Sequence, residues 1–171
     1  IGCIGIRVGN IGYSRIPRGY DDVLWNAVCS GINVMSAIGV RIRDADLSLT
    51  DMRRLATSAE EAGYQSVWLP ESMGRDAIAE LIALVSATKR ITVGTGIVPV
   101  FGRQPTLTAA AVATAAAIAP GRVILGVGIG HRDSLVGGHG IEFSRPLAHT
   151  REFVEIARQL LRGESVEHVG D

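Results

Sequence analysis

The residues of this chain that could do chemistry stand in short polar groups after apolar, β-branched runs. Arg43 follows the first run, Glu71 the second and His131 the fourth, while the third ends in Gly96-Ile97-Val98. An imidazole can exchange protons near neutral pH, and a guanidinium or a carboxylate can bind a complementary polar group. We therefore select His131 as a candidate acid/base, and Glu71 and Arg43 as candidate substrate ligands. Each could equally be an ordinary polar residue of a solvated loop.

Glycines surround the fourth of these polar groups. The segment 126–130 reads Gly-Val-Gly-Ile-Gly, but His131 and Asp133 stand where a dinucleotide-binding fingerprint would need its last glycine. Without side chains, glycines at a strand end allow a flat ligand to lie against the backbone. Gly128 and Gly130 are thus candidate cofactor contacts, with a tight turn that binds nothing as the alternative.

Arg103 stands two residues before Pro105, where a helix is predicted to begin. Its charge and the N-terminus of that helix could together attract an anion, which makes Arg103 a candidate cofactor ligand. A surface arginine at the rim of the fold is the alternative. No two histidines have the spacing of a metal-binding motif, so we predict no metal site.

Alternating strand and helix patterns must position these groups. Four strands are predicted, at 37–42, 66–70, 91–98 and 122–127. Each precedes an apolar stripe of helical spacing, and these helices are predicted from about 48 to 62, around 78–85, over 106–119 and from 146 to 162. Proline at the first turn and glycine after the last turn, as with Pro146 and Gly163, is typical of helix boundaries.

This alternation of strands and helices predicts an α/β fold with a parallel sheet. Four strand and helix units of roughly 34 residues each approach the spacing of a (β/α)8 barrel, in which eight units occupy roughly 250 residues. We expect residues 35–171 to be the first half of such a TIM barrel. An open doubly wound sheet is the alternative from periodicity alone, and in either fold ligands bind at the carboxyl ends of the strands.

Residues 1–34 differ from the rest of the chain. They are rich in glycine, show no regular apolar period and precede the first methionine, Met35, although the chain itself begins at Ile1. We expect this segment to be a poorly ordered upstream extension. A genuine arm specific to a family is the alternative.

Composition narrows the possible partners. The chain has 171 residues, of which 47% are hydrophobic and 20% charged, and its 17 basic residues equal its 17 acidic ones. This balance argues against nucleic acid or an anionic membrane as the main partner and favours a small-molecule substrate. Two cysteines without metal-like spacing indicate a reducing cytoplasm. No apolar run approaches the roughly 18 residues of a membrane span.

Several segments together resemble the luciferase-like monooxygenase superfamily, and more narrowly its branch of oxidoreductases that use coenzyme F420. The resemblance covers about residues 36–171. It rests on the following segments, in this order: Ala59 to Tyr64 leading to Ser66 to Glu71, Val93 to Val100, Gly121 to His131, and Ser144 to Leu147 with Arg151 and Glu152. It implies a TIM-type barrel whose third strand has a bulge with a cis peptide, here Gly96-Ile97. Gly96, Ile97 and Val98 would then contact the cofactor ring.

The resemblance implies an F420-dependent enzyme that transfers hydride between the deazaflavin and a small organic substrate. An FMN-dependent monooxygenase and an inactive or merely cofactor-binding barrel fragment are the alternatives. Two departures argue against naming a substrate: Gln104 stands where many relatives have histidine, and His131 where sugar-phosphate-oxidising members have glutamate. We expect the chain to be a piece of a longer protein, possible as a homodimer at full length. Alone it would be inactive and prone to associate, because a half barrel exposes strand edges and apolar surface.

Overall fold

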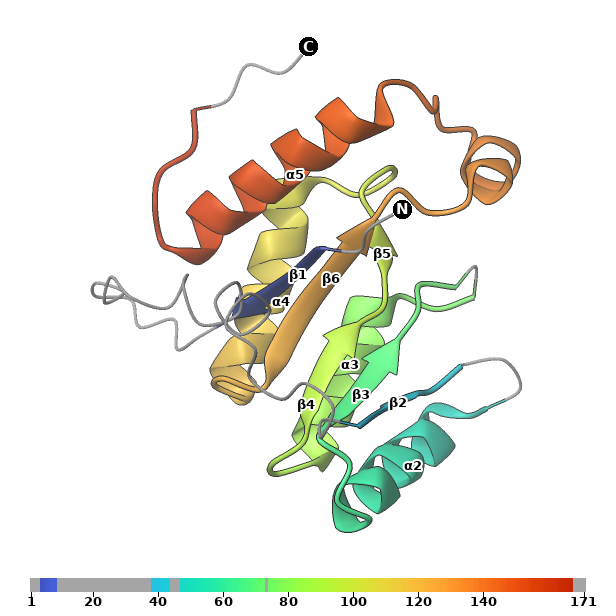
Figure 1. Ribbon diagram of the computed structural model, residues 1–171, viewed down its shortest axis with the longest axis vertical. Helices are drawn as coiled ribbons and strands as arrows, with labels where there is room; N and C mark the ends of the chain where they lie inside the picture. The colour runs from blue at the N-terminus through green and yellow to red at the C-terminus, as the bar shows by residue number, and fades with distance from the viewer. Residues whose placement is uncertain (1–3, 9–37, 44–46, 73, 168–171) are drawn as a thin grey trace.

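The computed structural model describes residues 4–8, 38–43, 47–72 and 74–167. A sheet runs through the centre of this part of the chain (Figure 1). Its parallel strands are β2 (Gly39–Arg41), β3 (Ser66–Leu69), β4 (Thr92–Thr95) and β6 (Val123–Gly128). They lie side by side in the order of the sequence, and β1 pairs with the outer edge of β6.

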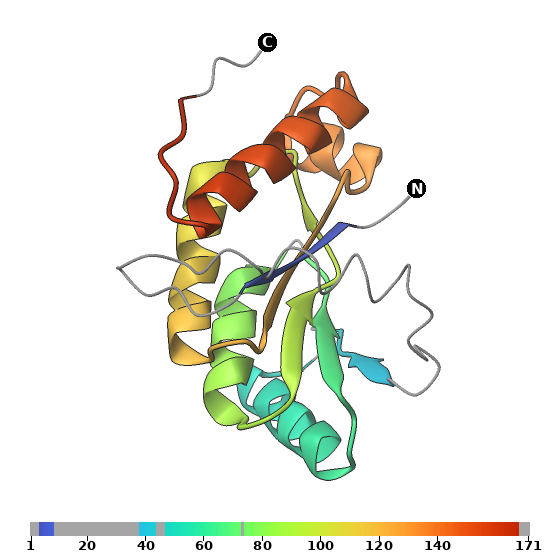
Figure 2. The ribbon, with the colours of Figure 1, turned by 60° about the vertical axis from the view of Figure 1, so that its left-hand side comes forward.

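Helices α2 (Leu49–Glu61), α3 (Ala77–Ala87) and α4 (Pro105–Ile118) connect these strands. All three cover the same face of the sheet, as two views of the ribbon show (Figures 1 and 2). A doubly wound sheet would reverse its strand order and carry helices on both faces. The sequential order with helices on one face is therefore that of consecutive units of a (β/α) barrel, as predicted.

The helix boundaries follow local capping rules. The Ser48 hydroxyl accepts a hydrogen bond from the N–H of Asp51 at the start of α2, and the Asp76 carboxylate accepts two at the start of α3. Pro105 and Pro146 open α4 and α5 (Pro146–Leu161). Gly63, predicted to end the first helix, has a φ of 85°, the left-handed conformation that glycine adopts without strain.

The core lies between the sheet and its helices. Fully buried side chains of β3, β4 and β6 pack there with buried residues of the helices, among them Met52, Leu81 and Val112. Alternate residues of β3 face the other way: Val67 and Leu69 are buried, whereas Ser66 and Trp68 are half-buried. The sheet thus has one face sealed by helices and one concave face, which in a complete barrel lies inside.

Trp68 occupies this concave face, and glycines on both neighbouring strands make room for its ring. A Cβ on Gly39 would lie 2.8 Å from the indole Nε1, and one on Gly94 would lie 2.6 Å from the ring carbon Cζ3. The indole N–H donates to the Ser66 hydroxyl at 2.9 Å. Any side chain at either glycine would have to displace the indole.

The third predicted strand is divided in two. After β4 the chain passes through a cis peptide at Gly96-Ile97 and then forms β5 (Val98–Pro99), which pairs with the end of β6. The bulge that the resemblance implied is therefore present. Hydrogen bonds attach it to its neighbours: Gly96 N donates to Leu69 O at 2.6 Å, and Glu71 N donates to Ile97 O at 3.0 Å.

Two elements were not predicted. Residues Ile4–Val8 form β1, antiparallel to β6 with Ile4 opposite Val127 and Val8 opposite Val123. These five residues belong to the segment 1–34 that we expected to be an upstream extension, and their β-branched sequence can pair with the edge of β6. The rest of segment 1–34 lies outside the described residues. A short π-helix, η2 (Ser134–Gly138), follows β6, in a stretch for which we predicted no helix or strand.

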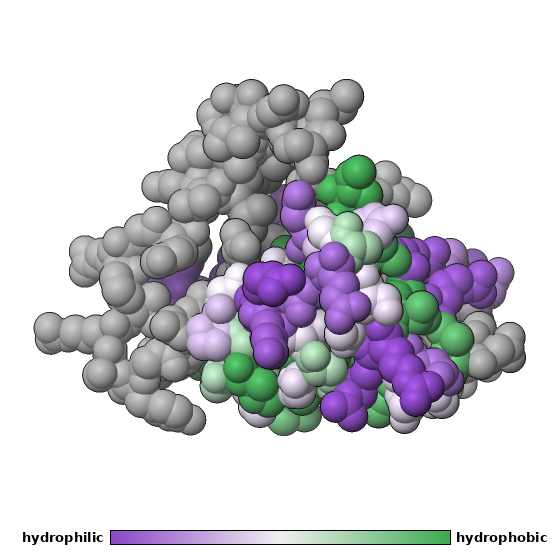
Figure 3. Space-filling model, turned by 90° about the horizontal axis from the view of Figure 1, so that it is seen from below, coloured by the Kyte–Doolittle hydropathy of each residue, from purple (hydrophilic) through white to green (hydrophobic). Residues whose placement is uncertain are grey.

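Seen from the amino ends of the strands, the molecule shows mostly hydrophilic or intermediate side chains with separate apolar patches (Figure 3). In the part of the chain with described structure, no helix is long and apolar enough to cross a membrane.

Candidate functional site

A hollow of about 360 Å³ opens at the carboxyl ends of the strands. Its walls come from the ends of β2, β3, β5 and β6, from the cis peptide and from η2. The lining residues are Arg41, Pro70, Glu71, Ser72, Gly96, Ile97, Pro99, Gly128, Ile129, Gly130, His131, Ser134, Leu135 and His139. The volume is within the range of small-molecule sites. We call its apolar and glycine lining residues the floor, and its charged or polar lining residues the rim.

The floor is shaped by close contacts of β6 with the bulge. A Cβ on Gly126 would lie 2.0 Å from the carbonyl oxygen of Thr95, and one on Gly128 would lie 3.3 Å from Cγ1 of Ile97. The Thr95 hydroxyl donates to Gly126 O at 2.9 Å and accepts from Gly126 N at 2.8 Å. A side chain at Gly126 would push the backbone of β6 away from Thr95, so the contact between the two segments requires glycine at this position.

An ion cluster stands behind one wall of the hollow. The Nη2 atom of Arg103 lies 2.6 and 2.8 Å from the two carboxylate oxygens of Glu71 and 2.7 Å from Oδ2 of Asp76. Burial of Arg103 would lower its pKa, but hydrogen bonds to both carboxylates outweigh this and raise it. The pKa of Asp76 is lowered: burial opposes the shift, and the N–H of Ala79 and the Arg103 charge outweigh it.

The structure brings six of the nine predicted site residues to this hollow. They are Gly96, Ile97, Gly128, Gly130, Glu71 and His131. His131 is exposed at the rim, directly after the glycines of the floor. Glu71 lines the wall and holds Arg103.

Three predicted residues do not line the hollow. Val98 is fully buried, because its side chain points from β5 into the core. Arg103 lies behind Glu71, where two carboxylates occupy its guanidinium. Arg43 is exposed and outside the lining because β2 ends at Arg41, and Arg41 takes the place that we predicted for Arg43.

Sequence reasoning missed two basic lining residues, Arg41 and His139. Arg41 was assigned to the interior of the first strand, although a strand one residue shorter would have placed it at the end. His139 follows two glycines, and η2 turns the chain so that it lines the same hollow as His131. Only the helical turn, which no sequence pattern indicated, brings these two histidines to one site.

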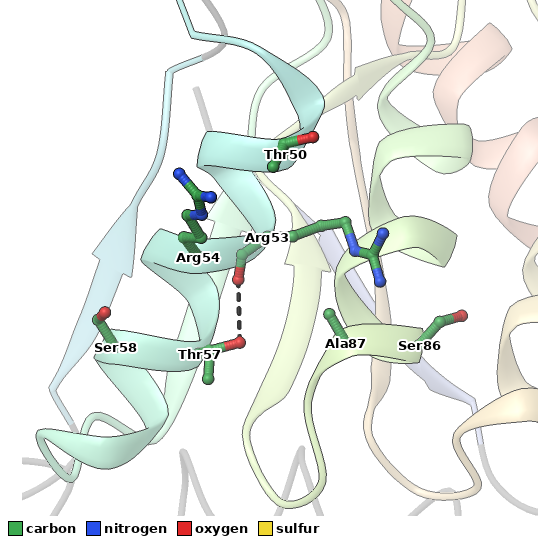
Figure 4. A pocket seen from close by; sticks show the side chains of 7 residues that line it. All are labelled: Thr50, Arg53, Arg54, Thr57, Ser58, Ser86 and Ala87. Carbon is green, nitrogen blue, oxygen red and sulfur yellow. Dashed lines mark hydrogen bonds between the residues drawn. The ribbon is translucent and has the colours of Figure 1, made fainter.

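A second hollow, of about 560 Å³, lies on the outer surface between α2 and α3 and is lined by Arg53, Arg54 and small residues (Figure 4). The hydroxyl of Thr57 donates to Arg53 O at 3.0 Å, and that of Ser86 donates to Ile82 O at 2.7 Å. These hydroxyls cannot also donate to a ligand. Within the described residues, no group of three or more histidine, cysteine or acidic residues could hold a metal ion. The hollow at the carboxyl ends is therefore the candidate site.

Consecutive parallel strands, helices on one face and a glycine floor at the carboxyl ends together define part of a (β/α) barrel, with a hollow where such barrels bind their ligands. A family model described as luciferase-like monooxygenase matches residues 30–171. The chain belongs to this family.

Similar proteins include several named for coenzyme F420 or a pterin substrate. A 5,10-methylenetetrahydromethanopterin reductase of Archaeoglobus fulgidus is 32% identical over 127 residues, which are 74% of this chain and 38% of that protein. An F420-dependent glucose-6-phosphate dehydrogenase of Amycolatopsis mediterranei is 31% identical over 150 residues, 80% of this chain and 45% of that protein. The chain thus spans less than half the length of these relatives.

Among solved structures, the coenzyme F420 dependent tetrahydromethanopterin reductase from Methanopyrus kandleri superimposes with a TM-score of 0.70 and 26% identity. The match covers 78% of this chain and 42% of that structure. The likeness confirms the predicted fold: the described units correspond to part of a luciferase-like barrel.

Proposed function

We propose that the protein to which this chain belongs is an F420-dependent oxidoreductase that transfers hydride between the deazaflavin and a small organic substrate. The observation that carries the proposal is the floor of the hollow, where Gly96 and Gly128 present backbone to a flat ligand. The names of the relatives support F420 as the cofactor. The proposal includes a cytoplasmic location and, for the whole protein, a homodimer.

The floor fits a planar ring. Gly96, Ile97, Gly128 and Gly130 line one continuous wall, and the Thr95 hydroxyl fixes β6 against the bulge beneath it. Val98 is buried below and supports this wall from the core side. When bound, F420 supplies the hydride chemistry, and the protein supplies position and electrostatics.

The rim residues have separate roles in this proposal. His131 stands where it could give or take a proton at a substrate atom above the ring. Glu71 contacts the substrate and is oriented by its two short contacts with Arg103. Arg103, predicted as a cofactor ligand, acts on the site through Glu71 in this arrangement.

FMN is the alternative cofactor, because the family model is named for monooxygenases and the same floor would accept a flavin ring. We would titrate the whole protein to which this chain belongs with F420 and, separately, with FMN, and follow quenching of the cofactor's fluorescence. Micromolar affinity for F420 with much weaker binding of FMN is expected. Preference for FMN would move the protein to the flavin-dependent class, and binding of neither would contradict the cofactor site.

Gly96→Val tests whether the floor is the binding surface. The Cβ itself has room, since the nearest Trp68 atoms would lie 3.6 Å away, but the valine methyl groups would occupy the floor. We expect the F420 affinity to fall at least about tenfold, equal to about 1.4 kcal/mol. Gly74→Val is the matched control, because a Cβ there meets nothing within 4 Å and Gly74 does not line the hollow. Equal losses in both variants would contradict the assignment.

Thermal unfolding is measured on the same samples. If Gly96→Val does not fold, Gly128→Ala replaces it, because its Cβ would meet only the flexible Ile97 side chain at 3.3 and 3.4 Å. Weakened F420 binding by a folded Gly128→Ala would support the floor, and unchanged binding would refute it.

A further inference from the structure

The rim of the hollow has an uneven distribution of charge. Three basic residues line it: Arg41 at the end of β2, and His131 and His139 on either side of η2. Glu71 is the acidic lining residue. Arg41 and the two histidines therefore reach one hollow from two different segments of the chain.

The charge of Glu71 is already compensated. Both of its carboxylate oxygens contact the Arg103 guanidinium, and Oε2 also accepts the N–H of Ala77 at 3.4 Å. Arg41, by contrast, forms no ion pair with any carboxylate in the described part of the chain. A guanidinium is charged at all physiological pH values and has five N–H donors, so a charge of opposite sign is its natural ligand.

We propose that Arg41, His131 and His139 form an anion-binding rim that holds a carboxylate or phosphate group of the substrate above the floor. The inference rests on the proposed function for the identity of the floor's ligand, and it adds the chemical class of the substrate. Arg41 determines specificity for the anion, because guanidinium groups match the geometry of carboxylate and phosphate oxygens. The two imidazoles donate further hydrogen bonds to the same group.

Two probes of the same shape test whether the hollow prefers a negatively charged ligand. Benzoate and benzamide have the same ring and differ in charge, and the NMR signals of the His131 and His139 rings report their binding to the whole protein. His131→Gln and His139→Gln assign these signals. We expect saturable benzoate binding, at least about tenfold tighter than that of benzamide, since hydrogen bonds between charged groups are stronger than those to a neutral amide.

Arg41→Met should reduce this preference, because it weakens benzoate binding more than benzamide binding. Arg43→Met is the matched control, because Arg43 is an exposed arginine two residues away that does not line the hollow. Equal binding of benzoate and benzamide, no binding of either, or equal losses in the two arginine variants would each overturn the proposal.

A second experiment distinguishes whether Arg41 binds an anionic group of the substrate or of the cofactor. FMN has a phosphate that riboflavin lacks, and the Arg41→Met variant is titrated with both. An equal effect of the substitution on the two ligands supports the substrate assignment. Selective loss of FMN affinity would show that Arg41 binds the cofactor phosphate, and would overturn it.

The experiments distinguish failure of the anion rim from failure of the proposed function. Selective benzoate binding with no F420 or FMN binding would refute the cofactor enzyme and leave the anion rim. F420 binding without benzoate selectivity would leave the enzyme and refute the rim.

Discussion

The two ends of the parallel sheet use their polar residues differently. At the amino ends, polar side chains are bound to the protein's own backbone. Arg122 donates to Ile91 O, Val85 O and Thr88 O, and to the Thr88 hydroxyl, at 3.0 to 3.1 Å. At the carboxyl ends, Arg41, His131 and His139 line an open hollow instead.

The Glu60 carboxylate is the acidic counterpart of Arg122. It accepts the N–H groups of Lys89 at 3.1 Å and Ile91 at 2.8 Å, together with that of Arg90 between them. One carboxylate thus satisfies three successive donors in the turn that leads into β4. Side chains occupied in this way hold helices to strands and have no capacity left for a ligand.

This difference implies a division of roles. In barrels of this class the carboxyl ends carry the chemistry and the amino ends contribute stability. Substitutions at the amino ends should therefore change the free energy of unfolding and leave ligand binding by the folded molecules unchanged. Substitutions of Arg41, which is exposed and lines the hollow, should do the reverse.

Arg122→Met is expected to have the largest effect on stability. The substitution removes four hydrogen bonds of a charged group and leaves three carbonyl oxygens at the base of the core without this donor, so the free energy of unfolding should fall by about 3 kcal/mol. Urea unfolding measures the loss. Lys89→Met is the control, an exposed cation at the same end whose ammonium group makes no hydrogen bond within the described residues. If the free energy of unfolding falls less in Arg122→Met than in Lys89→Met, the stabilising role assigned to the amino ends is contradicted.

Substitutions in the ion cluster test whether residues at the carboxyl ends also contribute to stability. Asp76 caps α3 through the N–H groups of Ile78 and Ala79, both at 2.9 Å, and contacts Arg103. Asp76→Ala removes both functions and should lower the free energy of unfolding by about 1.5 kcal/mol, within the range for helix caps. Asp76→Asn keeps an acceptor for the cap and loses only the charge, so it should cost about 0.5 kcal/mol.

Thermal or urea unfolding of both variants separates the cap from the ion pair. Equal losses would mean that the Arg103 contact, rather than the cap, provides the stability. The carboxyl ends would then combine both roles, because the Glu71 wall of the site would depend on the same ion pair that stabilises α3.

The sequence was sufficient to predict the repeated elements. Four strands, four helices and their proline and glycine boundaries come from local preferences, and the predicted helix at 106–119 differs from α4 by one residue at each end. The glycines at 128 and 130 could be assigned to the hollow for the same reason, since a strand that ends in glycine exposes backbone whatever surrounds it.

Register and distant pairing could not be predicted. We predicted Arg43 at the site, but Arg41 lines the hollow. Which arginine does so depends on where β2 stops pairing with β3, and the partner strand decides this. Arg103 was placed correctly before a helix, but its partners Glu71 and Asp76 are 32 and 27 residues away. A pattern that reads only neighbouring residues contains no information about such contacts. The same holds for Glu60, whose three donors are 29 to 31 residues away.

Glu60→Gln should have the smallest effect and the clearest dependence on pH. Partial burial would raise the pKa of Glu60, but the N–H donors of Ile91, Arg90 and Lys89 and the Arg90 charge lower it below its ordinary value of 4.5. A carboxylate with a lowered pKa contributes its stability above the unfolded-state value and loses it as the pH falls through the folded-state value. Solvent screens this partly exposed group, so the substitution should cost about 0.5 kcal/mol at pH 7.

Urea unfolding of wild type and Glu60→Gln at pH 7 and pH 3 measures this difference, which should shrink at the lower pH, where the wild-type carboxylate begins to be protonated. Glu61→Gln, one residue along α2 and exposed, is the control and should show no change at either pH. A difference that stays constant between the two pH values would mean that the geometry of the acceptor, and not its charge, holds the turn before β4. The amino end would then be stabilised by hydrogen-bond satisfaction alone, while the anion rim at the opposite end would remain the place where charge decides what is bound.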